Sequence, residues 1–242
     1  MQTDSLINHN SGYYGADTFD IGNVLVDEKY DYSDIEININ KHRTYFIIKR
    51  IIDVLLSCIA LVILSPVFLL TAIAIRLESK GNIIFTQMRT GKDGKVFKMY
   101  KFRSMCDGAE QMREKLLSQN EMDGPVFKIS NDPRVTKVGR FIRKTSIDEL
   151  PQLINIIKGD MSIVGPRPLV TYETDQFSDY HNRRHMVRPG LTCYWQISGR
   201  NDIPFDEWMA LDLKYLEDIG FWTDIKILLK TFIVVVTGKG AY

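Results

Sequence analysis

The chain has 242 residues, of which 45% are hydrophobic and 25% are charged, enough apolar material for one domain with appendages or for two small ones. Its three cysteines include no CxxC pair, which argues against a disulfide framework and against a cysteine metal site. The formal net charge is +1, but residues 1–40 hold eight acids and one lysine, a net of −7, which leaves +8 for the remainder. A basic body suits anionic partners.

Residues 1–40 are polar, acidic and without a sustained hydrophobic period. They predict a mobile tail or a partner-binding arm. They are not expected to form a signal peptide, because no apolar stretch follows a basic start.

An uncharged apolar run follows at residues 54–75. As a helix it would be about 33 Å long, close to the thickness of a bilayer core, so an ordinary transmembrane span is one interpretation. Ser65 and Pro66 lie at its centre, however, where Pro66 cannot donate a backbone hydrogen bond to Val62 and kinks the helix. The Ser65 hydroxyl is expected to satisfy part of the freed backbone.

Basic residues flank both ends of this run, Lys49 and Arg50 before it and Arg76 and Lys80 after it. A true span normally carries its positive bias on one side only. The flanks therefore favour a helix that enters the membrane, bends and returns to the same face, and the two interpretations stay open.

A β-hairpin is predicted next, with one strand beginning at residues 83–85, a turn at 92–95 and a partner strand over 96–103. On the second strand the alternation places Phe97, Met99, Lys101 and Arg103 on one face. An exposed helix is expected over about 107–119, and a loop at 131–133.

Ser146 and Glu149 have the spacing of a capping box, which predicts a helix that starts there and ends at Gly159. Pro151 allows the start to move by a few residues. Near the C-terminus a second amphipathic stripe is open to two interpretations, core packing or contact with a membrane surface. Its members are Ile225, Leu228, Leu229, Phe232, Ile233 and Val236.

Asp148 and Glu149 therefore lie at a predicted helix N-terminus, a position that keeps carboxylates ionised and can hold a phosphate. An ionised Asp can attack phosphorus, and an adjacent Glu can bind Mg²⁺. Simple helix capping is the alternative, and for the pair alone it is favoured. Four arginines are candidate phosphate ligands, three of them beside Pro or Gly: Arg143, Arg167, Arg188 and Arg200.

From Lys49 to the C-terminus the chain resembles the bacterial sugar transferases, the small monotopic phosphoglycosyl transferases that act on polyprenyl phosphate. The matching segments are KRIIDVLLS, the central SP, IIFTQMRTG, FKMYKFRSM, NDPRVTKVGRFIRKTSIDELPQLINIIKGDMSIVGPRP, RPGLTCYWQISGRN and LDLKYLED. So many ordered motifs make the resemblance specific.

The resemblance implies a mixed α/β fold in which a compact cytoplasmic body lies on a re-entrant membrane helix bent at Ser65 and Pro66. It implies that Asp148 is the nucleophile and Glu149 the Mg²⁺ ligand. Lys101, Arg143 and Arg167 match family positions for catalysis or phosphate binding. The expected division is a tail at 1–40, the re-entrant helix with its flanks at 41–80, and a catalytic domain with amphipathic membrane-surface helices at 81–242.

The implied reaction moves a sugar-1-phosphate from a UDP-sugar to polyprenyl (undecaprenyl) phosphate and releases UMP, at the cytoplasmic face of the bacterial inner membrane. It would begin the synthesis of an exopolysaccharide, capsule or other surface glycan. Membrane lipids are expected partners and nucleic acid is not; a homo-oligomer and the sugar stay open, although overall similarity favours glucose or galactose. The rival interpretations are a membrane-peripheral Mg²⁺-dependent phosphohydrolase and a non-catalytic adaptor for anionic lipids.

Overall fold

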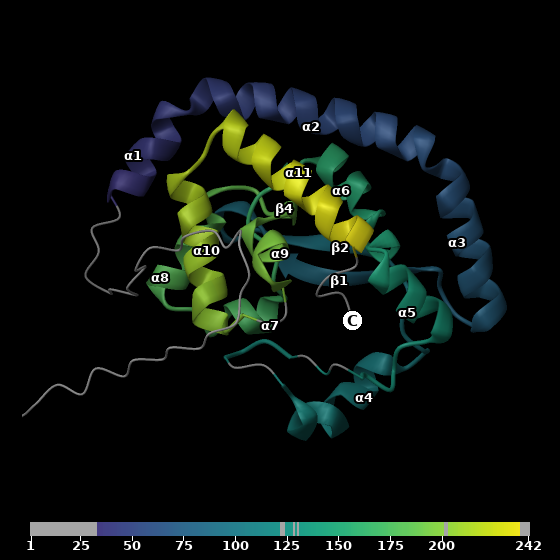
Figure 1. The fold of residues 1–242 in the computed structure, drawn as a ribbon. Coiled ribbons are helices and arrows are strands. Elements are labelled where there is room, and N and C mark those ends of the chain that lie inside the picture. Colours follow the sequence, from purple (N-terminus) through teal and green to yellow (C-terminus); the bar gives the residue numbers. More distant parts are fainter. Residues whose placement is uncertain (1–32, 122–123, 128, 130, 201–202, 238–242) are drawn as a thin grey trace, which may run out of the picture.

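The computed structural model describes residues 33–121, 124–127, 129, 131–200 and 203–237. This part of the chain is mixed α/β, as expected, with helices around two small two-stranded sheets (Figure 1). In chain order the elements are α1 (Ser33–Lys41), α2 (Arg43–Ile63), α3 (Ser65–Glu78), β1 (Ile84–Thr90), η1 (Lys92–Gly94), β2 (Val96–Phe102), α4 (Ala109–Leu116), η2 (Leu117–Gln119), α5 (Lys137–Lys144), η3 (Ile147–Glu149), α6 (Gln152–Lys158), β3 (Ser162–Val164), α7 (Thr171–Thr174), α8 (Asp179–Asn182), η4 (Arg183–Met186), β4 (Gly190–Thr192), α9 (Tyr194–Ser198), α10 (Phe205–Glu217) and α11 (Phe221–Thr237).

The apolar run forms two helices, α2 and α3, that arch around the body (Figure 1). They meet at a bend of 61°. The Ser65 hydroxyl donates a hydrogen bond of 2.8 Å to the carbonyl of Val62, the group that Pro66 leaves without a donor. The predicted kink and its compensation are thus confirmed. Within the described residues no single helix is long and apolar enough to cross a membrane, whereas this bent pair meets that requirement by length and composition.

Helix α2 turns its polar side inward and its apolar side outward. Its buried residues, one turn apart, are Tyr45, Lys49, Asp53 and Ser57. The helix of a water-soluble protein shows the opposite arrangement. Large side chains on the outward faces of α2 and α3 are exposed, and they are Ile47, Ile48, Ile51, Ile52, Leu55, Leu56, Ile59, Val62, Ile63, Leu69, Leu70, Ile73 and Leu77.

The inward polar stripe of α2 fastens this helix to the body. The Lys49 ammonium lies 2.5 Å from the Asp224 carboxylate at the start of α11, and the Tyr45 hydroxyl donates to the same carboxylate at 2.7 Å. One turn further on, Asp53 accepts a hydrogen bond of 2.8 Å from the Ser162 hydroxyl. These contacts hold α2 rigidly against the body, so the bend at its far end has a fixed direction.

The hairpin is formed as predicted, with β1 and β2 antiparallel in the register Ile84↔Phe102 to Thr90↔Val96. At the tip Asp93 has a φ of +56° and Gly94 a φ of +71°, the left-handed pair that an Asp-Gly turn supplies. The buried side of β2 contributes Phe97 and Met99 to a small core with α6. That packing puts Lys101, on the same strand, beside the start of α6.

The second sheet pairs β3 and β4 in parallel. The backbone just after β3 and the first residue of β4 approach closely, so that a Cβ on Gly190 would lie 2.1 Å from the backbone nitrogen of Gly165. Only glycine fits such an approach. The GPRP segment that starts at Gly165 is thereby packed against the RPG segment that ends at Gly190.

The expected tail is wrong for its last residues, because residues 33–41 form α1 and Ile35 is buried in the main core. Helix α1 is held by tertiary contacts that a local hydrophobic period does not reveal. The side-chain amide of Asn38 donates to the carbonyls of Leu216 and Glu217. Asn38 thereby caps the C-terminal end of α10. The rest of the predicted tail, residues 1–32, lies outside the described part of the chain.

The predicted capping box is also wrong. Ser146 has a φ of +57°, and its side chain makes no capping hydrogen bond. The acidic pair lies in the short 3₁₀ turn η3, and α6 begins only after Pro151. Its predicted end is confirmed, because Gly159 adopts a φ of +94° there.

For the C-terminal stripe on α11, core packing is wrong for most positions. Ile225, Leu228, Leu229, Phe232, Ile233 and Val236 are all exposed, and Trp222 is 83% exposed. The inward side of the helix is formed instead by Asp224 and Ile227. Like α2, this helix turns an apolar face away from the body.

Candidate active site

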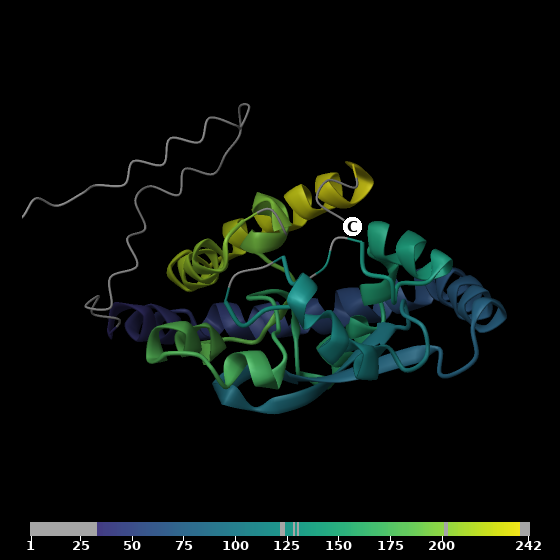
Figure 2. The ribbon, with the colours of Figure 1, turned by 90° about the horizontal axis from the view of Figure 1, so that it is seen from below.

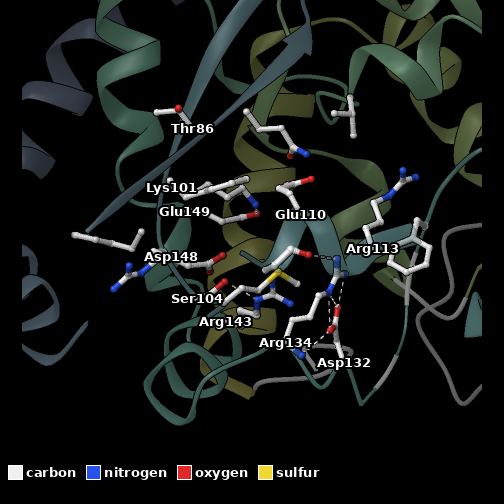
Figure 3. A pocket seen from close by; sticks show the side chains of 18 of the residues that line it. Thr86, Lys101, Ser104, Glu110, Arg113, Asp132, Arg134, Arg143, Asp148 and Glu149 are labelled. Carbon is white, nitrogen blue, oxygen red and sulfur yellow. Dashed lines mark hydrogen bonds and ion pairs between the residues drawn. The ribbon is translucent and has the colours of Figure 1, made fainter. Parts of the chain in front are cut away.

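A cavity of about 670 Å³ opens between the hairpin, α4, η3, the GPRP segment and α9. Figure 3 shows Lys101, Glu149, Asp148 and Arg143 gathered on one side of it, with Arg113 on the other. All but one of the catalytic and phosphate-binding residues predicted from the sequence line this cavity: Lys101, Arg143, Asp148, Glu149, Arg167 and Arg200.

Glu149 is held by two cations from distant parts of the chain. Its Oε1 accepts hydrogen bonds from Lys101 Nζ at 2.8 Å and from Arg167 Nη2 at 3.0 Å. Burial alone would raise the pKa of Glu149, but the charges of Lys101 and Arg167 outweigh it and bring that pKa well below its usual range. Glu149 is therefore a fixed carboxylate, and its Oε2 receives no hydrogen bond from the described residues.

Asp148 differs from its neighbour. It is 7% exposed and accepts no hydrogen bond from the described residues. Burial raises the pKa of Asp148 to about 6, although the charge of Lys101 opposes the rise. The expectation that the helix terminus would keep this group fully ionised is thus corrected: desolvation is the stronger effect. Near pH 7 Asp148 is mainly a carboxylate, and no hydrogen bond from the described part of the chain holds its lone pairs.

Arg143 reaches the cavity from α5, which Thr136 caps by accepting a hydrogen bond from the Gly139 amide at 2.9 Å. A Cβ on Gly139 would collide with the Ser104 carbonyl at 1.9 Å, so glycine lets α5 approach the strand end closely. Arg143 Nε then donates to Ser104 Oγ at 2.8 Å. Burial lowers the pKa of Arg143, and the charge of Asp148 opposes this shift. The charges of Arg143 and Asp148 therefore interact directly.

Arg200 lines the cavity with a backbone φ of +56°. Its Nε donates to the Gln196 carbonyl at 3.4 Å, while Nη2 is buried and has no hydrogen-bond acceptor among the described residues. A buried donor without an acceptor is costly unless a ligand supplies one. Arg200 therefore suits a phosphate oxygen, and its phosphate role stays a prediction.

Arg188 is not brought to this cavity. Its Nε donates to the Gly159 carbonyl at 2.8 Å, so it caps the far end of α6 together with Arg50, which binds the Ile156 carbonyl. Both arginines line a second cavity of about 350 Å³ beside α2. The predicted phosphate role of Arg188 at this site is wrong. Ser65 and Pro66 also lie outside the first cavity, in the helix bend.

Sequence reasoning missed the ion pair of Asp132 and Arg134, which lines the cavity opposite Asp148 (Figure 3). Arg134 Nη2 lies 2.6 Å from Asp132 Oδ2, and Nε also donates to this carboxylate. The i, i+2 spacing in NDPR could have indicated this local pair. It takes Arg134 out of the set of arginines available to phosphate.

The residues present fit Mg²⁺ in one particular mode. No group of three or more His, Cys, Asp or Glu side chains within the described ranges could hold a metal ion. Mg²⁺ in phosphoryl-transfer sites, however, is bound by one or two carboxylates and completed by substrate phosphates and water. Oε2 of Glu149, which accepts no hydrogen bond from the described residues, can supply such a carboxylate ligand.

Residues 44–238 match the bacterial sugar transferase family. The chain belongs to the bacterial sugar transferase family. The resemblance read from the motifs is confirmed, and these residues include every element from α2 to α11.

Three curated relatives are 40–47% identical to this chain. A galactosyl transferase, CpsE of Streptococcus agalactiae, is 47% identical over 199 residues, which are 82% of this chain and 44% of CpsE. The undecaprenyl-phosphate galactose phosphotransferase of Salmonella typhimurium is 42% identical over 215 residues, 86% of this chain and 44% of that protein. The exopolysaccharide production protein ExoY of Rhizobium meliloti is 40% identical over 198 residues, 80% and 88% respectively. The chain thus spans less than half of the first two relatives and most of the third.

Proposed function

We propose that this bacterial sugar transferase moves a hexose-1-phosphate from a UDP-sugar to undecaprenyl phosphate through a covalent intermediate on Asp148. One observation supports this most strongly, the difference between two adjacent carboxylates. Glu149 is fixed by Lys101 and Arg167, whereas Asp148 is buried in the same cavity without a hydrogen bond from the described residues. A nucleophile needs an available lone pair, and Asp148 has one.

In the first step an Oδ of Asp148 attacks the β-phosphorus of the UDP-sugar. The bond between this phosphorus and the oxygen that bridges to the α-phosphate breaks, and UMP leaves with the electron pair. Attack by an anion on a diphosphate requires cations around the phosphoryl oxygens. Arg143, Arg167 and Arg200 line the same cavity and supply that charge.

In the second step a phosphate oxygen of undecaprenyl phosphate attacks the phosphorus of the aspartyl phosphosugar. The Asp148 carboxylate leaves, and undecaprenyl diphosphate sugar is the product. Each step replaces one P–O bond with another, so no proton donor or redox partner is required.

We further propose that Mg²⁺, held by Glu149 and by substrate phosphate oxygens, offsets the diphosphate charge. Lys101 and Arg167 keep Glu149 ionised and oriented for this purpose. Removal of the metal with a chelator is expected to stop turnover, and added Mg²⁺ is expected to restore it.

The outer apolar faces support a membrane-bound acceptor. Exposed contiguous apolar surface marks a site of interaction with protein or membrane. Here it covers α2, α3 and α11, and the polar residues of α2 point to the body. A bend of 61° rather than a straight span supports a re-entrant helix. We propose that the body lies on the cytoplasmic face of the membrane.

The relatives' names guide the choice of sugar and pathway. Three name galactose or galactosyl transfer, another is an N-acetylgalactosamine phosphotransferase from Aeromonas hydrophila, and ExoY is named for exopolysaccharide production. We propose a galactose or glucose donor and the first membrane step of a surface polysaccharide.

The test is UMP release by the purified enzyme from UDP-galactose, UDP-glucose and UDP-N-acetylgalactosamine, with and without undecaprenyl phosphate. Sustained UMP release is expected only when the lipid phosphate is present, and Asp148→Asn should abolish it. Sustained release without lipid would mean a phosphohydrolase. Unchanged turnover in Asp148→Asn would rule out the assigned nucleophile, and no turnover with any donor would favour a non-catalytic adaptor.

A further inference from the structure

The backbone of the GPRP segment is hydrogen-bonded at almost every polar group. The Gly165 amide donates to the Thr192 carbonyl at 3.0 Å, and the Pro166 carbonyl accepts from the Gly190 amide at 2.8 Å. The Pro168 carbonyl accepts from Arg89 at 3.1 Å. The two prolines have no N–H to satisfy, and the carbonyl of Arg167 is the next group to account for.

The carbonyl of Arg167 meets one buried ion pair. Arg184 Nη2 donates to the Arg167 carbonyl at 2.5 Å and lies 2.5 Å from Asp212 Oδ2. Burial raises the pKa of Asp212 to about 6, although the charge of Arg184 opposes the rise. Asp212 thus holds the guanidinium of Arg184, and Arg184 holds the backbone of Arg167. Arg184 and Asp212 are 2% and 1% exposed and do not line the active-site cavity.

A buried ion pair adds little to the stability of a fold. Removing two charges from water costs several kcal/mol for each ion, so a hydrophobic pair of the same volume is often as stable or more stable. A hydrophobic pair could not donate a hydrogen bond to the Arg167 carbonyl, as Arg184 does. The contacts of Arg184 and Asp212 therefore indicate a role in placing Arg167.

Helix α10 also holds the side chain of Arg167. The Arg167 guanidinium lies over the Trp195 ring at 5.0 Å, and Trp195 stacks on Trp208 with ring centroids 4.6 Å apart. Trp208 and Asp212 are one turn apart on α10, which packs against α9 (Figure 1). One helix thereby supports both the backbone and the guanidinium plane of the arginine that binds Glu149.

We propose that Asp212 and Arg184 are positioning residues, which fix the backbone of Arg167 so that its guanidinium stays on Glu149, without touching substrate. The inference rests on the proposed phosphosugar transfer, because the purpose of this placement is the charge arrangement around Asp148. The sequence does not reveal this connection, since Arg167, Arg184 and Asp212 are far apart in the chain.

The first experiment is a double-mutant cycle on kcat/KM for UMP release, with Asp212→Asn and Arg167→Gln. If Asp212 acts through Arg167, Asp212→Asn should lower kcat/KM about tenfold in the wild-type background and less than about threefold when Arg167 is already Gln. Additive losses would overturn the proposal. Arg184→Lys, which keeps the charge beside Asp212 but loses the planar fork, is the second variant, should Asp212→Asn fail to fold.

The second experiment follows the guanidinium signals of Arg167 by NMR in protein carrying ¹⁵N-labelled Arg, and it requires no turnover. Arg167→Gln identifies these signals by their loss, and Asp212→Asn should shift or broaden them, because the guanidinium loses its fixed place over Trp195 and beside Glu149. The matched control is Asp224→Asn, which breaks another buried ion pair, with Lys49, away from the cavity. It should lower stability and leave the Arg167 signals unchanged.

These readouts separate the inference from the proposed function. Absence of UMP release by the wild-type enzyme would contradict the function, while changed Arg167 signals in Asp212→Asn would still support the positioning role. Unchanged Arg167 signals in Asp212→Asn, or the same change in Asp224→Asn, would show that Asp212 has only a structural role.

Discussion

Asp148 and Glu149 are neighbours in the sequence, yet their carboxylates have different surroundings. Glu149 binds a lysine from β2 and an arginine from the GPRP segment, whereas Asp148 has charged neighbours but no hydrogen bond from the described residues. Two carboxylates whose pKa values are pushed apart are suited to different roles. Glu149, whose pKa is lowered, suits a metal ligand, and Asp148, whose pKa is raised, suits a nucleophile.

The first prediction concerns pH. Because burial raises the pKa of Asp148 to about 6, the ionised nucleophile is lost as pH falls through this value. The rate of UMP release at limiting UDP-sugar should fall about tenfold per pH unit well below pH 6. The charge of Arg143 lowers the pKa of Asp148. Arg143→Gln should therefore shift the acid limb of the pH–rate profile, where the rate falls with falling pH, to higher pH.

The control is Arg140→Gln, on the exposed side of the same helix and outside the cavity. It should leave the acid limb in place. A flat profile down to pH 5 in the wild-type enzyme would contradict the assignment of Asp148.

The second prediction compares two arginines that look alike in the sequence, each followed directly by a proline. Arg167→Lys should lower kcat/KM about tenfold or more, because lysine lacks the planar fork that binds Glu149 and stacks on Trp195. Arg188→Lys should have a much smaller effect, because Arg188 caps α6 outside the cavity. Equal losses in steady-state assays of the two folded variants would contradict this placement.

At the residue scale the sequence could identify residue types and rigid turns, but not the direction in which each side chain points. Gly and Pro indicate correctly that Arg167 is pinned, and Arg188 is pinned as well. Which of them points to Asp148 depends on the parallel pairing of β3 and β4 and on the contact of Gly165 with Gly190. No local pattern contains that information.

At the scale of elements, the hairpin and the bend were predictable because each depends on local chemistry. An Asp-Gly turn selects the hairpin, and a proline breaks the helix. The start of α6 was not predictable in the same way. Its buried Asn155 binds the Tyr100 amide and the Lys98 carbonyl, so α6 is placed by β2 rather than by a cap of its own.

The third prediction tests the direction of the bent helix. Asn40 and Lys92 are on opposite sides of the apolar run in the sequence, yet both line the second cavity. Single cysteines at these two positions should therefore be labelled from the same side of sealed vesicles. The background should be Cys58→Ala and Cys106→Ala, because Cys193 is buried and its thiol pKa is raised to about 12.

Labelling of the two positions from opposite sides would mean that the helix spans the membrane. Pro66→Leu provides the comparison, since it restores the missing hydrogen bond and removes the steric cause of the bend. This variant is expected to place part of the population in a spanning state, as a straight run of this length matches the bilayer.

At the scale of the whole molecule, most large exposed apolar side chains lie on α2, α3 and α11. The main core is formed by α9, α10 and the parallel sheet, with α1 and the first turn of α2 packed on it. Figure 2 shows α11 and the hairpin at opposite sides of the body. The sequence could predict that α11 is amphipathic, but only the packed body shows that its apolar face is turned outward.

The fourth prediction uses this arrangement. Phe232→Glu on α11 should weaken binding to liposomes of bacterial lipids about tenfold or more, because a 71% exposed aromatic side chain loses its apolar contact with lipid. The fold should be retained, since the side chain has little core packing to lose. The matched control is Val96→Glu, an exposed apolar position on the hairpin, and co-sedimentation that drops equally for both variants would contradict a specific membrane face.

The most direct measurement of the central claim is the mass of the intact enzyme after mixing with UDP-sugar alone. A covalent step before the acceptor binds predicts about one UMP released per active site and a hexose phosphate added to the peptide that contains Asp148. Asp148→Asn should show neither. If UMP appears only when undecaprenyl phosphate is also present, and no adduct forms at any time, the transfer is direct and Asp148 is not its nucleophile.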